Sequence, residues 1–284
     1  MATAKRVKGQ EDLSPILDLC KRVLGLTARS SQLELSAPLS PKQLTVLRQI
    51  YLLTTKIEAH LNAMLVLARG GWGIEALILL RTMVESAATG RLLLVAPDEA
   101  LYGIIQDAIR AQKEYIAWAL TPPKGQRSSV WENERRKEVE RDISESKVAL
   151  QEFFPDGVPD GPLLHDHRGR PRPWRRIPVR EKLLAAGMTD AYGPFYAWPS
   201  AHLHAGGGSF AHYLPADKQT PWHVRAEGGP KPGLLPMALL GGAKVLLFQL
   251  CTEEKAFGLR PNVELAQLAR EVSRLLATWG ERDS

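Results

Sequence analysis

Residues 74–94 read IEALILLRTMVESAATGRLLL, and this stretch decides the fold class. Each residue of an α-helix rotates the chain by about 100°. One side of the expected helix therefore carries Arg81, Glu85 and several apolar residues, and the opposite side is apolar as well. The apolar residues are Ile74, Leu77, Ile78, Ala88 and Leu92 beside Arg81, and Leu79, Leu80 and Met83 opposite. A helix that is hydrophobic all round lies inside a protein.

The charged pair on this helix is therefore expected to be buried or to line an internal cleft. Arg81 keeps its proton in a protein and needs a partner, and the i,i+4 spacing brings Glu85 within reach. Apolar residues can often replace such a pair without loss of stability. Its presence predicts either an internal clamp between helices or a ligand-binding or catalytic site.

Helical patterning also covers most of the remaining chain. Ser40-Pro41 is a strong helix start, because Ser caps a helix and Pro suits its first turn. We expect helices at about residues 11–28, 40–69, 72–94, 99–120, 128–154, 179–186, 190–204, 234–254 and 262–279. No run of residues alternates as a strand would. The sequence therefore predicts an all-α helical bundle of about seven to nine helices.

The expected organisation is a single helical domain at residues 11–280, preceded by a basic, disordered N-terminus at residues 1–10. Two long irregular loops interrupt it near residues 155–177 and 214–233, and loops of this length are usually functional or disordered. Within the 128–154 helix, residues 132–147 are charged nearly all round, which is typical of a solvated outer helix.

Composition indicates an intracellular protein with anionic partners. The net charge is +6, which mildly favours anions over cations. Cys20 and Cys251 lie far apart and form no C-x-x-C pattern, as expected for free thiols in a reducing compartment. Residues 1–10 do not resemble a secretory signal. The most apolar stretches, 74–96 and 233–250, contain charges, Pro or paired Gly, so we expect no membrane contact and a cytoplasmic location.

A second group of polar residues lies in the 190–204 helix. Tyr196, Ser200 and His204 are four residues apart, so they share one face of a continuous helix. Pro199 kinks or restarts that helix, because it lacks a backbone N–H. His204 also stands directly before three glycines, where a histidine at a helix end is favoured by the helix dipole.

These two groups together carry a family resemblance. Ala76-x3-Leu80-Arg81-x3-Glu85, followed more than a hundred residues later by Ser200-x3-His204, resembles the domain of unknown function 5677 family, over roughly residues 42–249. The resemblance implies a helical bundle in which Arg81, Glu85, Ser200 and His204 converge on one polar pocket. It implies no reaction, because no activity is established for that family.

The arginine-rich loop supplies a third set of candidate binding residues. These are Arg168, Arg172, Trp174, Arg175 and Arg176, to which we add Tyr196 from the helix that follows. Arginines around an aromatic ring suit contact with phosphates and bases, although a solvated basic loop has the same composition. His165 and His167 form no recognised zinc or di-iron pattern. No nucleotide-binding motif occurs, and we expect neither a metal nor a cofactor.

Three functions remain open at this point. The first is the binding of an anionic ligand, or a regulatory role, with Arg81 recognising the anion. The second is a metal-independent ribonuclease related to the HEPN type, with His204 as general base and the arginine loop on the RNA. No Arg here is followed by His at the R-x4–6-H spacing of such enzymes. The third is a structural or homo-oligomeric helical protein, in which Arg81 and Glu85 are only a clamp.

Overall fold

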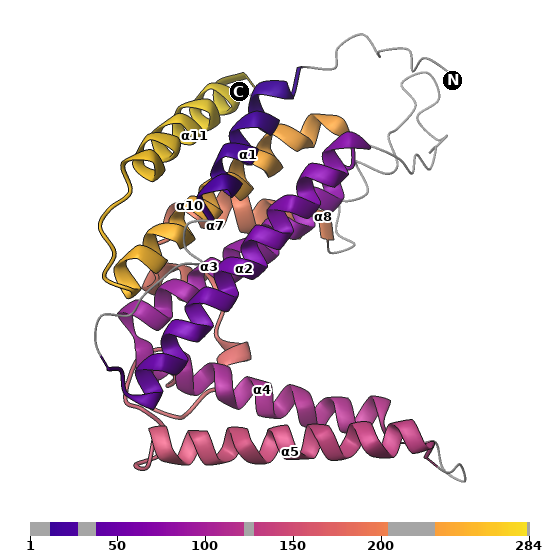
Figure 1. Ribbon diagram of the computed structural model, residues 1–284, viewed down its shortest axis with the longest axis vertical. Helices are drawn as coiled ribbons and strands as arrows, with labels where there is room; N and C mark the ends of the chain where they lie inside the picture. Colours follow the sequence, from indigo (N-terminus) through magenta and orange to yellow (C-terminus); the bar gives the residue numbers. More distant parts are fainter. Residues whose placement is uncertain (1–11, 28–37, 122–127, 204–230, 283–284) are drawn as a thin grey trace.

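The computed structural model describes residues 12–27, 38–121, 128–203 and 231–282 (Figure 1). Within these ranges the chain is helical and contains no strand, and the one β-type contact is an isolated bridge between His165 and Pro171. The predicted all-α bundle is confirmed. The predicted N-terminal tail at residues 1–10, and most of the predicted loop at 214–233, lie outside the described residues.

The long helices follow the expected ranges closely. They are α1 Ser14–Thr27, α2 Pro41–Arg69, α3 Gly73–Val95, α4 Pro97–Ala119, α5 Val130–Phe153, α10 Leu235–Ala256 and α11 Val263–Arg282. Short helices lie between α5 and α10: η2 Trp174–Arg176, α6 Val179–Ala185, α7 Thr189–Tyr192, η3 Gly193–Ala197 and α8 Trp198–Leu203, with η4 Pro232–Leu234 leading into α10.

Two helix starts are fixed by reciprocal side-chain caps. The Ser40 hydroxyl accepts a hydrogen bond from the Gln43 backbone N–H at 3.2 Å, and the Gln43 side chain accepts one from the Ser40 N–H at 3.0 Å. Ser129 and Glu132 form the same arrangement at the start of α5. Such caps pair backbone donors that a helix cannot pair internally, which is why these two boundaries were readable from the sequence.

The main core is built around α3 and α10, which pack against each other and against α2. Figure 1 shows α1 and α11 alongside α10. Gln249 of α10 lies fully buried at the point where α3 approaches, and donates to the Ile50 carbonyl and the Thr54 hydroxyl of α2, both at 3.2 Å. Gly90 of α3 leaves room for it: a Cβ there would lie 2.5 Å from the Gln249 Oε1.

One helical segment of the described chain, Pro232–Ala256, is long and apolar enough to cross a membrane by length and composition. In the fold, 72% of its most apolar window is buried inside the protein, where α10 packs on α1, α2, α3 and α11. Its hydrophobicity is therefore accounted for by its central place in the core.

Helices α4 and α5 form an antiparallel hairpin that extends along the bottom of Figure 1, beyond the rest of the fold. A small separate core of Ile109, Leu120, Val139 and Ile143 joins the two helices. Only Val139 and Ile143 of α5 are buried, so the prediction of a charged, solvated outer helix is confirmed.

The predicted 155–177 loop and 190–204 helix are refined by the structure. Residues 154–173 are irregular, and η2 forms one short turn before α6. Instead of one helix at 190–204, the chain forms α7, a π-helical turn at η3, and α8. Pro194 lies in the wide turn and Pro199 near the start of α8, where the missing N–H of proline is tolerated.

Candidate functional site

Arg81 and Glu85 form the ion pair that the sequence predicted, with Nε and Oε1 3.3 Å apart. Their burial was overestimated: the Arg81 side chain is 24% exposed and that of Glu85 is 43% exposed. The core helices α2 and α10 cover the face of α3 that holds Leu77, Leu80 and Val84. The face with Arg81 and Glu85 is apolar in part, yet it lies at the edge of the core and includes the exposed Ile78.

Tyr196 is the residue of the second polar group that meets this pair. The Arg81 guanidinium donates to the Tyr196 hydroxyl at 3.2 Å, and its central carbon lies 5.0 Å from the ring centroid. Tyr192 stacks on Tyr196 with centroids 5.7 Å apart, and Arg180 lies 6.0 Å from the Tyr192 centroid. Burial and the nearby Glu85 raise the pKa of Tyr196, while Arg81 partly offsets them.

This arginine–tyrosine stack, Arg81–Tyr196–Tyr192–Arg180, joins α3 to α6, α7 and η3. The wide turn of η3 contains Tyr196, and such turns are frequent at functional sites. The sequence pointed to Arg81 and Tyr196 as site residues and to Arg180 only as part of the basic segment, and Tyr192 was not among the candidates. The i,i+4 spacing of the two tyrosines was a signal available in the sequence.

Of the two remaining predicted site residues, the structure describes Ser200 but not His204. Ser200 lies in α8, which packs against α3, and its hydroxyl oxygen is buried without a hydrogen-bond partner in the part of the chain that the structure describes. His204 lies outside the described residues. The convergence of its imidazole with Arg81 and Glu85 therefore stays a prediction.

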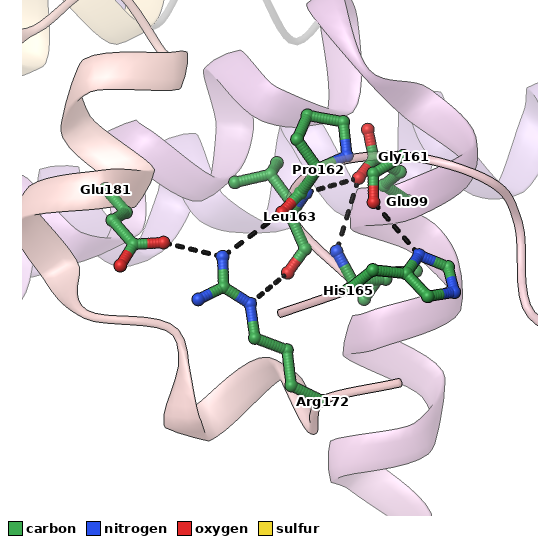
Figure 2. A network of polar contacts seen from close by, with 8 residues as sticks. Glu99, Gly161, Pro162, Leu163, His165, Arg172 and Glu181 are labelled. Carbon is green, nitrogen blue, oxygen red and sulfur yellow. Dashed lines mark hydrogen bonds and ion pairs between the residues drawn. The ribbon is translucent and has the colours of Figure 1, made fainter. Parts of the chain in front are cut away.

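Arg172 of the arginine-rich loop holds the loop itself together, as Figure 2 shows. It donates to the Leu163 carbonyl at 2.9 Å and the Pro162 carbonyl at 3.2 Å, and pairs with Glu181 of α6 at 2.5 Å. The same part of the loop is also held by α4, because the Glu99 carboxylate accepts a hydrogen bond from the Leu163 backbone N–H at 2.8 Å. The Nε and Nη2 groups of Arg172 thus bind other parts of the protein.

Of the other predicted loop residues, some contact the rest of the protein and some are exposed to solvent. Trp174 is buried against Gly103 of α4, where a Cβ would lie 2.5 Å from the indole ring. Its ring is therefore not free to stack on a base. Arg175 pairs with Glu114 at 2.8 Å, whereas Arg168 and Arg176 are exposed.

A short turn precedes Arg172 and is held by Asp166. Its carboxylate accepts from the backbone N–H groups of Arg168 and Arg170 and pairs with the Arg170 side chain. These contacts, the Arg170 backbone N–H first among them, lower the pKa of Asp166 to about 2. In the described part of the chain, no group of three or more His, Cys, Asp or Glu residues is placed to hold a metal ion.

A polar pocket of about 220 Å³ lies beside the Arg81–Glu85 pair, between α2, α3 and α6. Its lining consists of Leu53, Lys56, Thr82, Glu85, Ser86, Ala88, Thr89, Trp174, Val179 and Lys182. The three hydroxyl groups each donate to a backbone carbonyl one turn earlier in α3. The polar groups that line the pocket are thus the lone pairs of these hydroxyl oxygens, the two lysines, and Glu85, whose Oε1 pairs with Arg81.

Lys182 is the least expected member of this pocket. Its ammonium lies 4.3 Å from the centroid of the Trp174 ring. Burial lowers the pKa of Lys182 to about 8, although the carboxylates of Asp107 and Glu85 act in the opposite direction. Lys56 and Lys182 were not among the sequence candidates, because each belongs to an ordinary amphipathic helix and only the fold brings them to one pocket.

Comparison with known protein families identifies the family of this chain. A model described as a family of unknown function (DUF5677) matches residues 49–221. The chain belongs to the DUF5677 family. The resemblance noted in the sequence is thereby confirmed, and the DUF5677 region includes Arg81, Glu85, Lys182, Tyr196 and Ser200. No curated protein and no solved structure matches the chain.

Proposed function

We propose that this DUF5677 protein binds a small anionic ligand, a carboxylate or a phosphate, in the pocket between α2, α3 and α6. The main support is the partial burial of Lys182 without a carboxylate in direct contact. Lys182 is half-buried in the pocket wall, and among the described residues no carboxylate lies within ion-pair distance of its ammonium. A partly desolvated ammonium with no carboxylate in direct contact is unfavourable, so the pocket favours an anion that makes this contact.

The local charge balance supports an anion. Lys56 and Lys182 line the pocket together with one carboxylate, Glu85, which Arg81 already pairs. A second carboxylate, Asp107 of α4, does not line the pocket. Burial raises the pKa of Asp107, and the nearby Lys182, Arg110 and Arg175 partly offset this rise. The two lysines thus leave a surplus of positive charge that the described carboxylates do not fully neutralise.

The pocket size restricts the ligand. Pockets for drug-sized molecules usually enclose about 300–1,000 Å³, whereas this one encloses about 220 Å³. We therefore expect an anion of a few heavy atoms, such as a short dicarboxylate or inorganic phosphate. Arg81, held by Glu85 and Tyr196, would form the adjoining wall and not the primary ligand contact.

Thermal unfolding tests the proposal with inorganic phosphate, oxalate, malonate and succinate, and with the neutral succinamide as a comparison. Ligands that bind only the folded state raise the midpoint with concentration. We expect at least one anion to do so and succinamide not to. Lys182→Met should remove the shift, and Lys113→Met, the same charge loss at an exposed site on α4, should retain it.

Two results would count against anion binding at this pocket. One is a set of anions none of which shifts the midpoint at millimolar concentration. The other is a shift that survives in Lys182→Met, which would place the ligand elsewhere on the protein. Neither the geometry nor the sequence favours the ribonuclease alternative over this one.

A further inference from the structure

Helix α4 carries two apolar stripes, and among the described residues the fold covers only one of them. The covered stripe contains Ile105, Ile109, Ile116 and Leu120, which pack against α5. The second stripe, called here the alanine–aromatic stripe, consists of Ala108, Ala111, Tyr115 and Trp118. All four residues are exposed, with Tyr115 at 38% and Trp118 at 87%.

The spacing of the alanine–aromatic stripe is that of a helix-pairing face. Its residues follow one another at intervals of three, four and three, which is the repeat of the two core positions in a coiled coil. At about 100° per residue they fall within a wedge of about 80° on one side of α4. A single exposed apolar residue needs no explanation, but a contiguous stripe of this kind marks an interaction surface.

We propose that this stripe pairs with the same stripe of a second copy of the chain, in antiparallel orientation. The stripe runs from two small residues to two large ones. A two-fold axis beside residue 113 would place Trp118 of each copy over Ala108 of the other, and Tyr115 over Ala111. Large side chains then meet small ones, so the surface is complementary to itself, as a two-fold interface requires.

Helix α5 extends the same surface near the end of the hairpin. The Arg135 guanidinium contacts Glu138 and the Tyr115 hydroxyl, and these contacts raise its pKa. Trp131 lies four residues before Arg135 and therefore on the same side of α5. It is 65% exposed, which adds a second large aromatic residue beside Trp118, and aromatic residues are enriched at interfaces.

Charge on the flanks of the stripe allows two copies to approach. Glu114, which borders the stripe, is paired with Arg175 at 2.8 Å. Asp107, on the same flank, has Arg110, Arg175 and Lys182 as neighbours. The acidic flanks of two antiparallel helices are therefore neutralised within each copy and do not oppose pairing.

The overall charge of the α4–α5 hairpin disfavours an anionic lipid surface as the partner. Residues 97–153 contain nine Lys or Arg and eleven Asp or Glu, so the hairpin lacks the basic excess that attracts such a surface. The remainder of the chain is basic, since the whole carries a net charge of +6. A second copy of the chain is thus the partner that both shape and charge support.

Sedimentation over a concentration series tests the proposal on the full-length protein. We expect wild type to shift from monomer to dimer, and Ala111→Glu to weaken the dimer at least tenfold, because a carboxylate would be placed opposite Tyr115 of the other copy. Ala117→Glu is the matched control: it is equally exposed but lies on the opposite side of α4. It should dimerise like wild type, and circular dichroism should show all three folded.

The antiparallel arrangement has its own test. In a Cys251→Ser background, a mixture of the single variants Ala108→Cys and Trp118→Cys should form a mixed disulfide dimer, while each variant alone should cross-link weakly. Strong cross-linking of Trp118→Cys with itself would overturn the orientation. A wild type that stays monomeric at high concentration, a dimer unaffected by Ala111→Glu, or binding of the monomer to anionic vesicles through Trp118 would overturn the proposal.

Discussion

The ammonium of Lys182 lies 4.3 Å from the centroid of the Trp174 ring, and this contact joins the arginine-rich loop to the polar pocket. Trp174 itself is buried against α4, at the one point where Gly103 leaves space for it. The position of the pocket lysine therefore depends on a glycine in a different helix. This chain of contacts makes the pocket sensitive to a substitution that touches no polar group.

Gly103→Ala should both destabilise the protein and weaken anion binding. The new Cβ would lie 2.5 Å from the indole, so Trp174 or α4 must move, and overpacking of this kind typically costs about 1–3 kcal/mol. Denaturant unfolding measures the first effect and the ligand-induced shift in melting temperature the second. Gly25→Ala is the control, since nothing lies within 4 Å of its Cβ. It should be neutral or stabilising, because Ala is the better helix former.

Lys182 should also leave a signature in the pH dependence of stability without ligand. Burial lowers its folded-state pKa from 10.5 to about 8, so between these values the unfolded chain binds more protons than the folded one. The destabilisation is complete below about pH 8 and is relieved as the pH rises towards 10.5. Wild type should therefore gain stability relative to Lys182→Met between pH 8 and 10. Parallel curves for the two proteins over that interval would contradict the assigned cause.

The Arg81–Glu85 pair should contribute little to stability by itself. Both side chains keep contact with solvent, at 24% and 43% exposure, and part-exposed ion pairs are usually worth less than about 1 kcal/mol. Replacing both, as Arg81→Met with Glu85→Leu, also removes the contacts between Arg81 and Tyr196, and should change the free energy of unfolding by no more than about 2 kcal/mol. A loss of several kcal/mol in urea titrations would instead support the reading in which the pair is an internal clamp.

The elements that local chemistry determines were predictable from the sequence. Ser40 and Ser129 each stand three residues before a Gln or Glu that completes the cap, so both helix starts were readable to within a residue or two. The charged surface of α5 was readable for the same reason. Each of these features depends on neighbours within one or two turns.

The candidate site could not be predicted in the same way, because it is formed by contacts between residues far apart in the sequence. A helical wheel of α3 treats every apolar neighbour of Arg81 as buried, but the fold leaves Ile78 exposed and the pair at the edge of the core. Trp174 lies among arginines in the sequence, yet Gly103, about seventy residues earlier, determines its burial. Lys56 and Lys182 are separated by more than a hundred residues and meet only after α2 and α6 have packed against α3.

Glu253 gives a prediction independent of the pocket. Its side chain is 1% exposed in α10, and neither carboxyl oxygen has a hydrogen-bond partner in the described part of the chain. Burial and the nearby Glu58 raise its pKa to about 7. The Thr54 hydroxyl beside it offsets this only in part, because that hydroxyl is directed at the Ile50 carbonyl.

The sign of the effect follows from the raised pKa. Between about pH 4.5 and 7 the folded state holds a proton that the unfolded state has lost, so the stability from neutral Glu253 is complete below pH 4.5 and is lost as the pH rises through 7. The difference amounts to about 3 kcal/mol at most. Glu253→Gln, which keeps the neutral shape, should therefore be more stable than wild type at pH 8 and similar at pH 4.5. Glu140→Gln, at an exposed site on α5, is the control, and an equal change in both variants at pH 8 would refute the assignment.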